Sequence, residues 1–190
     1  MVREDLRPSI ARLSGAADGV TLQLETTLVD VGAACAPLVG HAIHLWHADS
    51  NGHYSLYDIV DQNHLRGVVV TDAAGKARVT SVFPGCNDGR WPHIHFEVFA
   101  RLEAATDGHT ALLTSQFALP AAAARTVYAD ARYVESLPNL GNVTLQGDMI
   151  FGDNTPEQIT QQTVAVSADA AQGLKVTAVV VLKVRNILRA

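Results

Sequence analysis

The stretch from Val20 to Leu28 alternates apolar and polar residues, and it constrains the fold more than any other part of the sequence. Val20, Leu22, Leu24 and Leu28 would share one face of a strand, and the polar residues between them would share the other. Side chains that repeat with a period of two mark a half-buried β-strand. The chain is therefore expected to build a sheet with one face on a core.

Other segments read as strands in the same way. They are Ala42–Trp46, Leu65–Thr71, Ala77–Phe83, His93–Phe99, Ala111–Phe117 and Val176–Val184. Turn-forming residues at 72–76 separate the second from the third, so these two are expected to form a hairpin. Short strands at this spacing predict an all-β fold, namely an immunoglobulin-like antiparallel β-sandwich.

Only one segment is expected to be helical. Pro120–Ala129 is rich in alanine after a proline, which suits a short helix. The region Glu135–Asp153 contains one proline and three glycines, and it is expected to form long, irregular loops. The sequence has neither an internal repeat nor a linker, so residues 1–190 are predicted to form one domain.

Composition narrows the class of partner. The 190-residue chain is 48% hydrophobic and only 17% charged, as expected of a globular protein with a sizeable core. Its net charge of −5 argues against nucleic acid, whose phosphates need clustered Lys and Arg. Its apolar runs fall far short of the roughly 20 residues that span a membrane. Nucleic acid and membrane are therefore not expected as partners.

The N-terminal sequence MVREDLRPSI is charged and has no apolar stretch, so no signal peptide is expected. The protein is expected in the cytoplasm, or outside the cell if a targeting segment has been removed. Cys35 and Cys86 are too few to define a disulfide framework. Free thiols are expected, with one bridge between them as the alternative.

The pair His93 and His95 is the strongest chemical signal in the sequence. In a strand these two side chains project to the same side, and Ile94 projects to the other. Two neutral imidazoles on one face of a rigid strand can bind one metal ion. The same pair would also suit a polar, solvent-facing strand, so the dipeptide alone leaves both interpretations open.

The surroundings of this pair favour the metal. Four segments follow one another in a characteristic order: HLWHADSNGHYSLYD at 44–58, LRGVVVTD at 65–72, PGCNDGRWPHIHF at 84–96 and TSQF at 114–117. In this order and spacing they resemble the intradiol ring-cleavage dioxygenases. That family includes the catechol and protocatechuate enzymes and smaller, single-domain bacterial relatives.

The resemblance implies a site around non-haem Fe(III), with Tyr54, His93 and His95 as metal ligands. It places Arg90 beside the substrate and Gln116 near the reacting ring. The implied reaction opens a catechol-class aromatic diol with O₂ to a muconate-type diacid, and a homodimer would be compatible with it. A fixed positive charge such as Arg90 would stabilise anionic character that develops on the ring. Specificity would come from the loops at 56–64 and 135–154.

Each of these residues also has a simpler interpretation. Tyr54 could pack at a strand end with its hydroxyl in water, and Arg90 could close a turn or pair with Asp88. The remaining histidines and tyrosines of these regions are expected to be non-ligands and packing residues, respectively, although a tyrosine could line the pocket: His41, His44 and His47, and Tyr57, Tyr128 and Tyr133.

Asn87 departs from the family pattern, because it stands where the family has a second tyrosine ligand. The site would lose one negative charge and a base that takes up a substrate proton. Three explanations stay open. Asn87 could be an engineered substitution that weakens a dioxygenase, or it could mark a relative with altered metal chemistry. The domain could also be a non-catalytic binder of a metal or small molecule.

Overall fold

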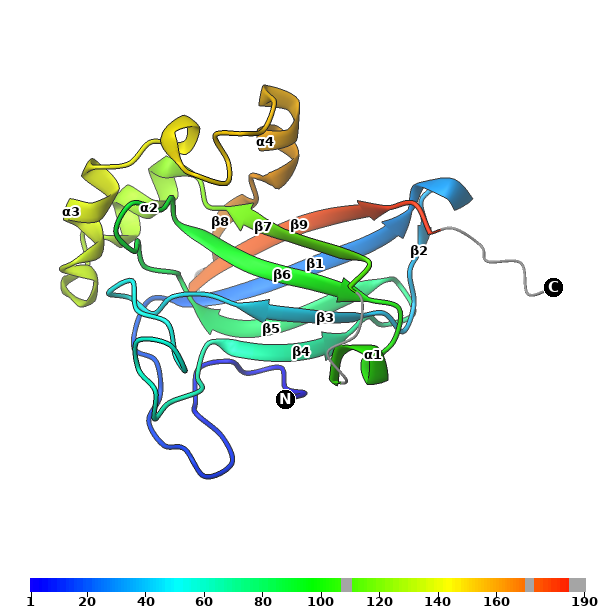
Figure 1. Cartoon of the computed structure of the whole chain (residues 1–190), viewed down its shortest axis with the longest axis horizontal. Coiled ribbons are helices and arrows are strands. Elements are labelled where there is room, and N and C mark those ends of the chain that lie inside the picture. Colours follow the sequence, from blue (N-terminus) through cyan, green and yellow to red (C-terminus); the bar gives the residue numbers. More distant parts are fainter. Residues whose placement is uncertain (107–110, 170–172, 185–190) are drawn as a thin grey trace.

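The computed structural model of the protein describes residues 1–106, 111–169 and 173–184, which form two β-sheets packed face to face (Figure 1). The smaller sheet has the order β4-β3-β6-β7 and is antiparallel throughout. Its strands are β3 (Ala42–Trp46), β4 (Arg66–Val70), β6 (His93–Phe99) and β7 (Leu113–Ala118). The predicted all-β sandwich is confirmed.

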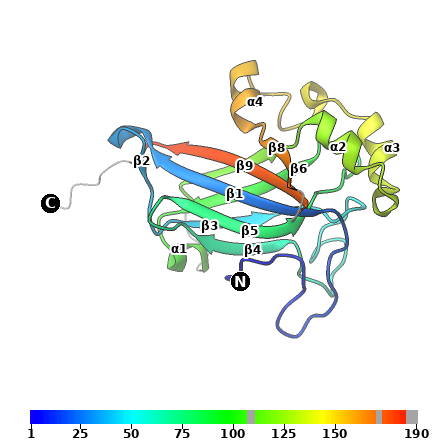
Figure 2. The ribbon, with the colours of Figure 1, turned by 180° about the vertical axis from the view of Figure 1, so that it is seen from behind.

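The second sheet is built around β1 (Thr21–Asp30), which lies at the front of the view from behind (Figure 2). β1 pairs with β2 (Ala36–Pro37), β5 (Lys76–Val82) and β9 (Gly173–Leu182). β9 pairs in turn with β8 (Ala165–Asp169). β1 and β9 run parallel. The prediction of a purely antiparallel sandwich is therefore wrong for this pair of strands. Parallel strands need a long connection, and most of the chain lies between β1 and β9.

The predicted hairpin between Leu65–Thr71 and Ala77–Phe83 is also wrong. The turn between them exists, because the Asp72 carboxylate accepts hydrogen bonds from the amides of Ala74 and Lys76. The strands then enter different sheets, with β4 paired to β3 and β5 paired to β1. The turn thus forms a corner of the sandwich, and each strand buries apolar side chains from its own side of the core.

The described residues form four short α-helices where one was predicted: α1 (Leu102–Thr106), α2 (Ala121–Val127), α3 (Ser136–Gly141) and α4 (Pro156–Gln162). α2 is the predicted alanine-rich helix. α4 begins with a capping box, in which the Thr155 hydroxyl accepts a hydrogen bond from the Gln158 amide and the Gln158 side chain accepts one from the Thr155 amide. Single turns of 3₁₀ helix occur at Val31–Ala33, Ala131–Tyr133 and Leu145–Gly147.

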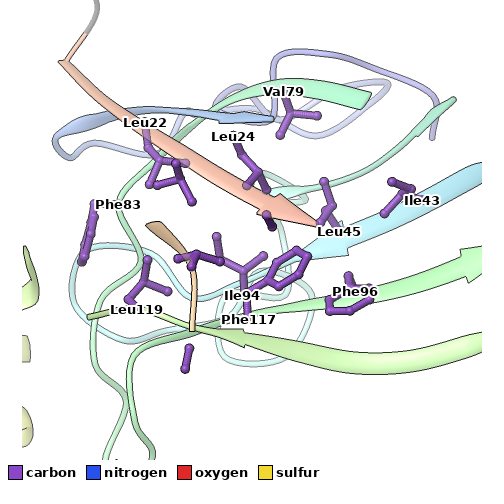
Figure 3. Packing of buried hydrophobic residues seen from close by; sticks show 14 of the residues in the cluster. Leu22, Leu24, Ile43, Leu45, Val79, Phe83, Ile94, Phe96, Phe117 and Leu119 are labelled. Carbon is purple, nitrogen blue, oxygen red and sulfur yellow. The ribbon is translucent and has the colours of Figure 1, made fainter. Parts of the chain in front are cut away.

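The core lies between the sheets and follows the alternation of the sequence (Figure 3). Leu22 and Leu24 of β1 are buried, whereas their neighbours in the strand are half-exposed. Across the core they face Leu45 of β3 and Ile94 of β6, among other apolar side chains. Since Ile94 points inward, His93 and His95 must lie on the opposite face of β6.

Loops and helices cover one end of the sandwich. β6 begins at this end, and α2, α3 and the connection between β3 and β4 gather around it (Figure 1). Cys35 is exposed and Cys86 is buried, and both are free thiols, as predicted. Within the described ranges, no helix is long and apolar enough to cross a membrane.

Candidate metal centre

Strand β6 is the platform of the site, because its first three residues carry both histidines. His95 lies opposite Trp46 of β3 on one side and opposite Gln116 of β7 on the other. The Trp46 indole is stacked on the His95 imidazole, with the ring centroids 4.7 Å apart and the planes 5° from parallel. Neighbouring strands therefore fix the orientation of His95.

Tyr54 reaches the histidines from the loop between β3 and β4. A tight turn holds its backbone, because the Tyr54 carbonyl accepts hydrogen bonds from the amides of Asp58 and Ile59 and the Tyr54 amide donates to the Asp58 carboxylate. Its Oη lies 3.0 Å from His93 Nε2 and 3.3 Å from His95 Nε2. The two Nε2 atoms are 3.0 Å apart. The convergence expected of these three side chains is present.

The protonation of His93 follows from its partners. Its Nδ1 lies 2.5 Å from the carbonyl oxygen of Trp91, which can only accept a hydrogen bond, so Nδ1 carries the proton. Burial, followed by the charge of Arg90, lowers the pKa of His93 to about 4. The imidazole is thus neutral at pH 7, and its Nε2 presents a lone pair toward Tyr54 and His95.

His95 and Tyr54 also favour their uncharged forms. Burial, with the charges of His93 and Arg90, lowers the pKa of His95 to about 3. Burial also raises the pKa of Tyr54, because a phenolate would be poorly solvated there. Three electron-rich atoms therefore face one another in a place where water does little to solvate them.

These three atoms fit a metal ion. A point equidistant from them lies about 1.8 Å from each, close to the roughly 2.0–2.2 Å at which imidazole and oxygen ligands hold transition metals. In the part of the chain that the structure describes, no three His, Cys, Asp or Glu side chains gather into a metal site. The third donor here is a tyrosine, whose phenolate suits a hard cation such as Fe(III).

Arg90 and Gln116 lie together beside the donors. Arg90 Nη2 donates a hydrogen bond of 2.7 Å to Gln116 Oε1, and Arg90 Nε donates one of 2.9 Å to Asp148. Arg90 thus pairs with Asp148, and not with Asp88 as the simpler interpretation had it. Its charge acts on Tyr54 and on both histidines.

Asn87 lies in the loop that leads to β6. Its carbonyl accepts a hydrogen bond from the Arg90 amide at 3.2 Å, whereas its half-buried side chain forms no hydrogen bond to a described residue. Ser136 anchors this loop, because its Oγ accepts a hydrogen bond from the Cys86 amide. The backbone of Asn87 also packs against Gly52, two residues before Tyr54.

Comparison with known proteins identifies the family of this chain. A family model described as Dioxygenase matches residues 6–121, which is more than half of the chain. The chain belongs to the intradiol dioxygenase family. A catechol 1,2-dioxygenase from Acinetobacter baylyi is 30% identical over 127 residues, which are 55% of this chain and 38% of the relative. The chain thus matches well under half the length of that curated relative.

Solved structures of the intradiol dioxygenase family share the fold. An intradiol ring-cleavage dioxygenase from Tetranychus urticae superposes with a TM-score of 0.75 at 18% identity, covering 97% of this chain and 88% of that one. The dioxygenase domain of a carbohydrate-binding fusion from Streptomyces sp. SirexAA-E gives 0.63 at 24% identity, covering 97% and 89%. Catechol 1,2-dioxygenase from Pseudomonas arvilla C-1 gives 0.59 at 24%, covering 94% and 56%.

The three histidines expected to be non-ligands contact the surrounding scaffold. His47 is buried, with Nδ1 donating to the Ala48 carbonyl and Nε2 2.7 Å from Ser81 Oγ. His44 lies 3.4 Å from a Glu97 carboxylate oxygen and stacks on Trp46. His41 contacts the Val39 carbonyl through Nδ1.

Of the three other tyrosines, two are buried in the core and the third lies at the surface beside Tyr54. Tyr128 and Tyr133 are buried and donate hydrogen bonds to the carbonyls of Pro84 and Phe83, as expected of packing residues. Tyr57 is 67% exposed, so the expectation that it packs is wrong. Its ring lies edge-on to Tyr54 with the centroids 6.5 Å apart.

Sequence reasoning missed Asp148 and Phe151. Asp148 receives the Arg90 ion pair, and the Phe151 ring lies edge-on to His93 with the centroids 6.5 Å apart. Both fall in the loop region from which specificity was expected, and both are buried. An aspartate in a glycine-containing stretch is an ordinary turn residue, so nothing local singles it out.

Proposed function

We propose that this protein is a non-haem iron dioxygenase of the intradiol type, which opens a catechol-class aromatic diol with O₂ to a muconate-type diacid. The convergence of Tyr54 Oη with His93 Nε2 and His95 Nε2 supports this proposal most directly. Family membership agrees with it. The family resemblance also leads us to propose a homodimer, for which sedimentation velocity is the direct test.

Tyr54, His93 and His95 would hold the metal, since together they provide one hard anionic and two neutral ligands. Bound Fe(III) would supply the Lewis acidity that makes a catechol anionic and open to O₂. The Trp91 carbonyl keeps the proton of His93 on Nδ1, which leaves Nε2 free for the metal. The indole stacked on His95 holds the second imidazole in place.

Arg90 would act on the substrate and not on the metal. Its side chain is only 15% exposed and is held in an ion pair with Asp148. A positive charge held in a place with little water stabilises anionic character on a ring more effectively than a solvated one. Gln116 accepts a hydrogen bond from Arg90, so it would help to hold the guanidinium in place for a bound ring.

Asn87 determines how active the enzyme is. An amide side chain brings no negative charge, so the three-donor site has a weaker preference for Fe(III) over divalent ions. A bound catechol would also lose its second proton to water, hydroxide or another residue. We propose that this substitution weakens the dioxygenase. The specific alternative that Asn87 supports is a metalloprotein with a different ion and an open coordination position.

Colour and turnover of the Asn87→Tyr variant test this proposal. Protein loaded with Fe(III) should absorb visible light through its tyrosinate, and catechol should shift the band to longer wavelength. Tyr54→Phe should abolish the band. Tyr57→Phe is the matched control, because it removes the hydroxyl of an exposed neighbour of Tyr54 and should leave the band unchanged.

Asn87→Tyr should deepen the colour and increase the rate of ring cleavage. If it does neither while Tyr54→Phe still bleaches the protein, the altered metal chemistry is the better explanation. If iron gives no band in the wild type, the iron dioxygenase fails, and a metalloprotein with a different ion or a non-metal binding role is left.

A further inference from the structure

The Asp148 carboxylate is completely buried and accepts hydrogen bonds on both oxygens. Its Oδ2 receives Arg90 Nε at 2.9 Å and the Trp91 amide at 2.7 Å. Its Oδ1 receives the amides of Ile150 and Phe151 at 2.8 and 3.1 Å, with Arg90 Nη2 at 3.5 Å. A buried carboxylate persists as an anion only with such partners.

This arrangement fixes the guanidinium of Arg90 by one edge. Nε and Nη2 face Asp148, and the second proton of Nη2 goes to Gln116. Nη1 forms no hydrogen bond with a residue in the described part of the chain. Because a guanidinium is planar and rigid, holding one edge sets the direction of the other donors.

Asp148 also balances the charge of Arg90 at the donors. Burial is the largest influence on the pKa of Tyr54 and His93, but after it Arg90 lowers both values and Asp148 raises both. Burial alone would raise the pKa of Asp148 itself, yet the hydrogen bonds from Arg90 and three backbone amides keep it below its usual value. Asp148 therefore faces Arg90 as a carboxylate anion.

We propose that Asp148 is a positioning residue, which holds Arg90 by its Nε–Nη2 edge so that Nη1 is presented to a diol beside Tyr54, His93 and His95. The identity of the diol rests on the proposed function. A purely structural role is the competing explanation, because Asp148 also caps the turn of Ile150 and Phe151. The two explanations differ in whether a loss of Asp148 acts through Arg90.

The test uses Asp148→Asn, which keeps the shape of the side chain but turns an NH₂ group toward donors on one side. Asp130→Asn is the matched control, because Asp130 also makes a two-point pair with an arginine, Arg132, away from the donors. Each is combined with Arg90→Lys, which keeps the charge but removes the planar fork. Steady-state kinetics with catechol gives kcat and KM for all variants.

Asp148→Asn should lower kcat about 100-fold, as a misplaced catalytic group does, with KM changed by less than about threefold. In the Arg90→Lys background it should lower kcat by no more than about twofold, because its effect is already lost. Asp130→Asn should leave kcat unchanged. Losses that multiply in the double variant, or an unchanged kcat in Asp148→Asn, would overturn the proposal.

A second measurement does not depend on activity. With Ga(III) in place of iron, ¹⁵N NMR follows the exchange of the Arg90 Nε proton with water, which should be slow in the wild type and fast in Asp148→Asn. Fast exchange in the wild type would overturn the proposal even if the variant does not fold. A wild type that cleaves no catechol would refute the proposed function alone, since the exchange rate still shows whether Asp148 holds Arg90.

Discussion

Gly52 fixes the loop of Tyr54 against the loop of Asn87, and replacing it with alanine should cost much stability. Its φ of +90° is strained for any residue with a Cβ, at about 1–2 kcal/mol. A Cβ would also lie 2.8 Å from the Cys86 carbonyl oxygen and 2.9 Å from the Asn87 backbone. Those backbone atoms cannot rotate away, and such overpacking adds about 1–3 kcal/mol. Gly52→Ala should therefore lose about 2–5 kcal/mol.

Two other glycines separate these contributions. Gly89 has a φ of +72° with no atom within 4 Å of its Cβ position, so Gly89→Ala should lose only the conformational cost of about 1–2 kcal/mol. Gly141 has neither a positive φ nor a close neighbour, and Gly141→Ala should be neutral or stabilising by about 0.4–1 kcal/mol.

Urea unfolding of the four proteins, at constant metal content, gives these differences in the free energy of unfolding. Equal losses for Gly52→Ala and Gly89→Ala would refute the close approach of the two loops. In the iron-loaded protein Gly52→Ala should also shift the tyrosinate band, because the clash displaces the residues next to Tyr54.

Three further outcomes are expected. Thr155→Ala should lose about 1 kcal/mol in urea unfolding because it removes the cap of α4, and an unchanged midpoint would contradict the cap. Burial raises the pKa of the Cys86 thiol to about 12, so a thiol reagent at pH 8 should modify Cys35 alone until urea is added. Burial lowers the pKa of His47 to about 4, below its ordinary value, so the unfolded chain takes up a proton first as the pH falls. The wild type should lose up to about 3 kcal/mol more stability than His47→Gln between pH 6.5 and 4, and parallel pH profiles would disprove this.

The sequence was enough to predict seven of the nine described strands to within a few residues, and the alternation is clearest in β1, which buries every second side chain along most of its length. The short strands β2 and β8 were missed. The sequence could not predict how the strands pair. The turn at Asp72 has the same local hydrogen bonds in a hairpin and in a corner between sheets, so Leu65–Thr71 and Ala77–Phe83 were joined wrongly. The parallel pairing of β1 with β9 leaves no local signal either.

The residues of the candidate site also differ in whether the sequence could predict them. His93 and His95 share a face because they are two residues apart in one strand, and this could be predicted from the sequence. Tyr54 could be placed beside them only through the family resemblance. Asp148 lies far along the chain from Arg90, in a region without periodicity, and its role depends on burial that only the fold creates.

The parallel pairing of β1 with β9 also bears on the order in which the chain gains its structure. The sheet that carries the proposed ligands is complete within residues 42–118. β1 and β9 are separated by on the order of 140 residues, and closing that loop costs about 2 kcal/mol more chain entropy than closing the roughly 20 residues between β3 and β4. Folding is expected to start in the local sheet and to end with β9, an order that earlier amide protection in β6 than in β9 would reveal.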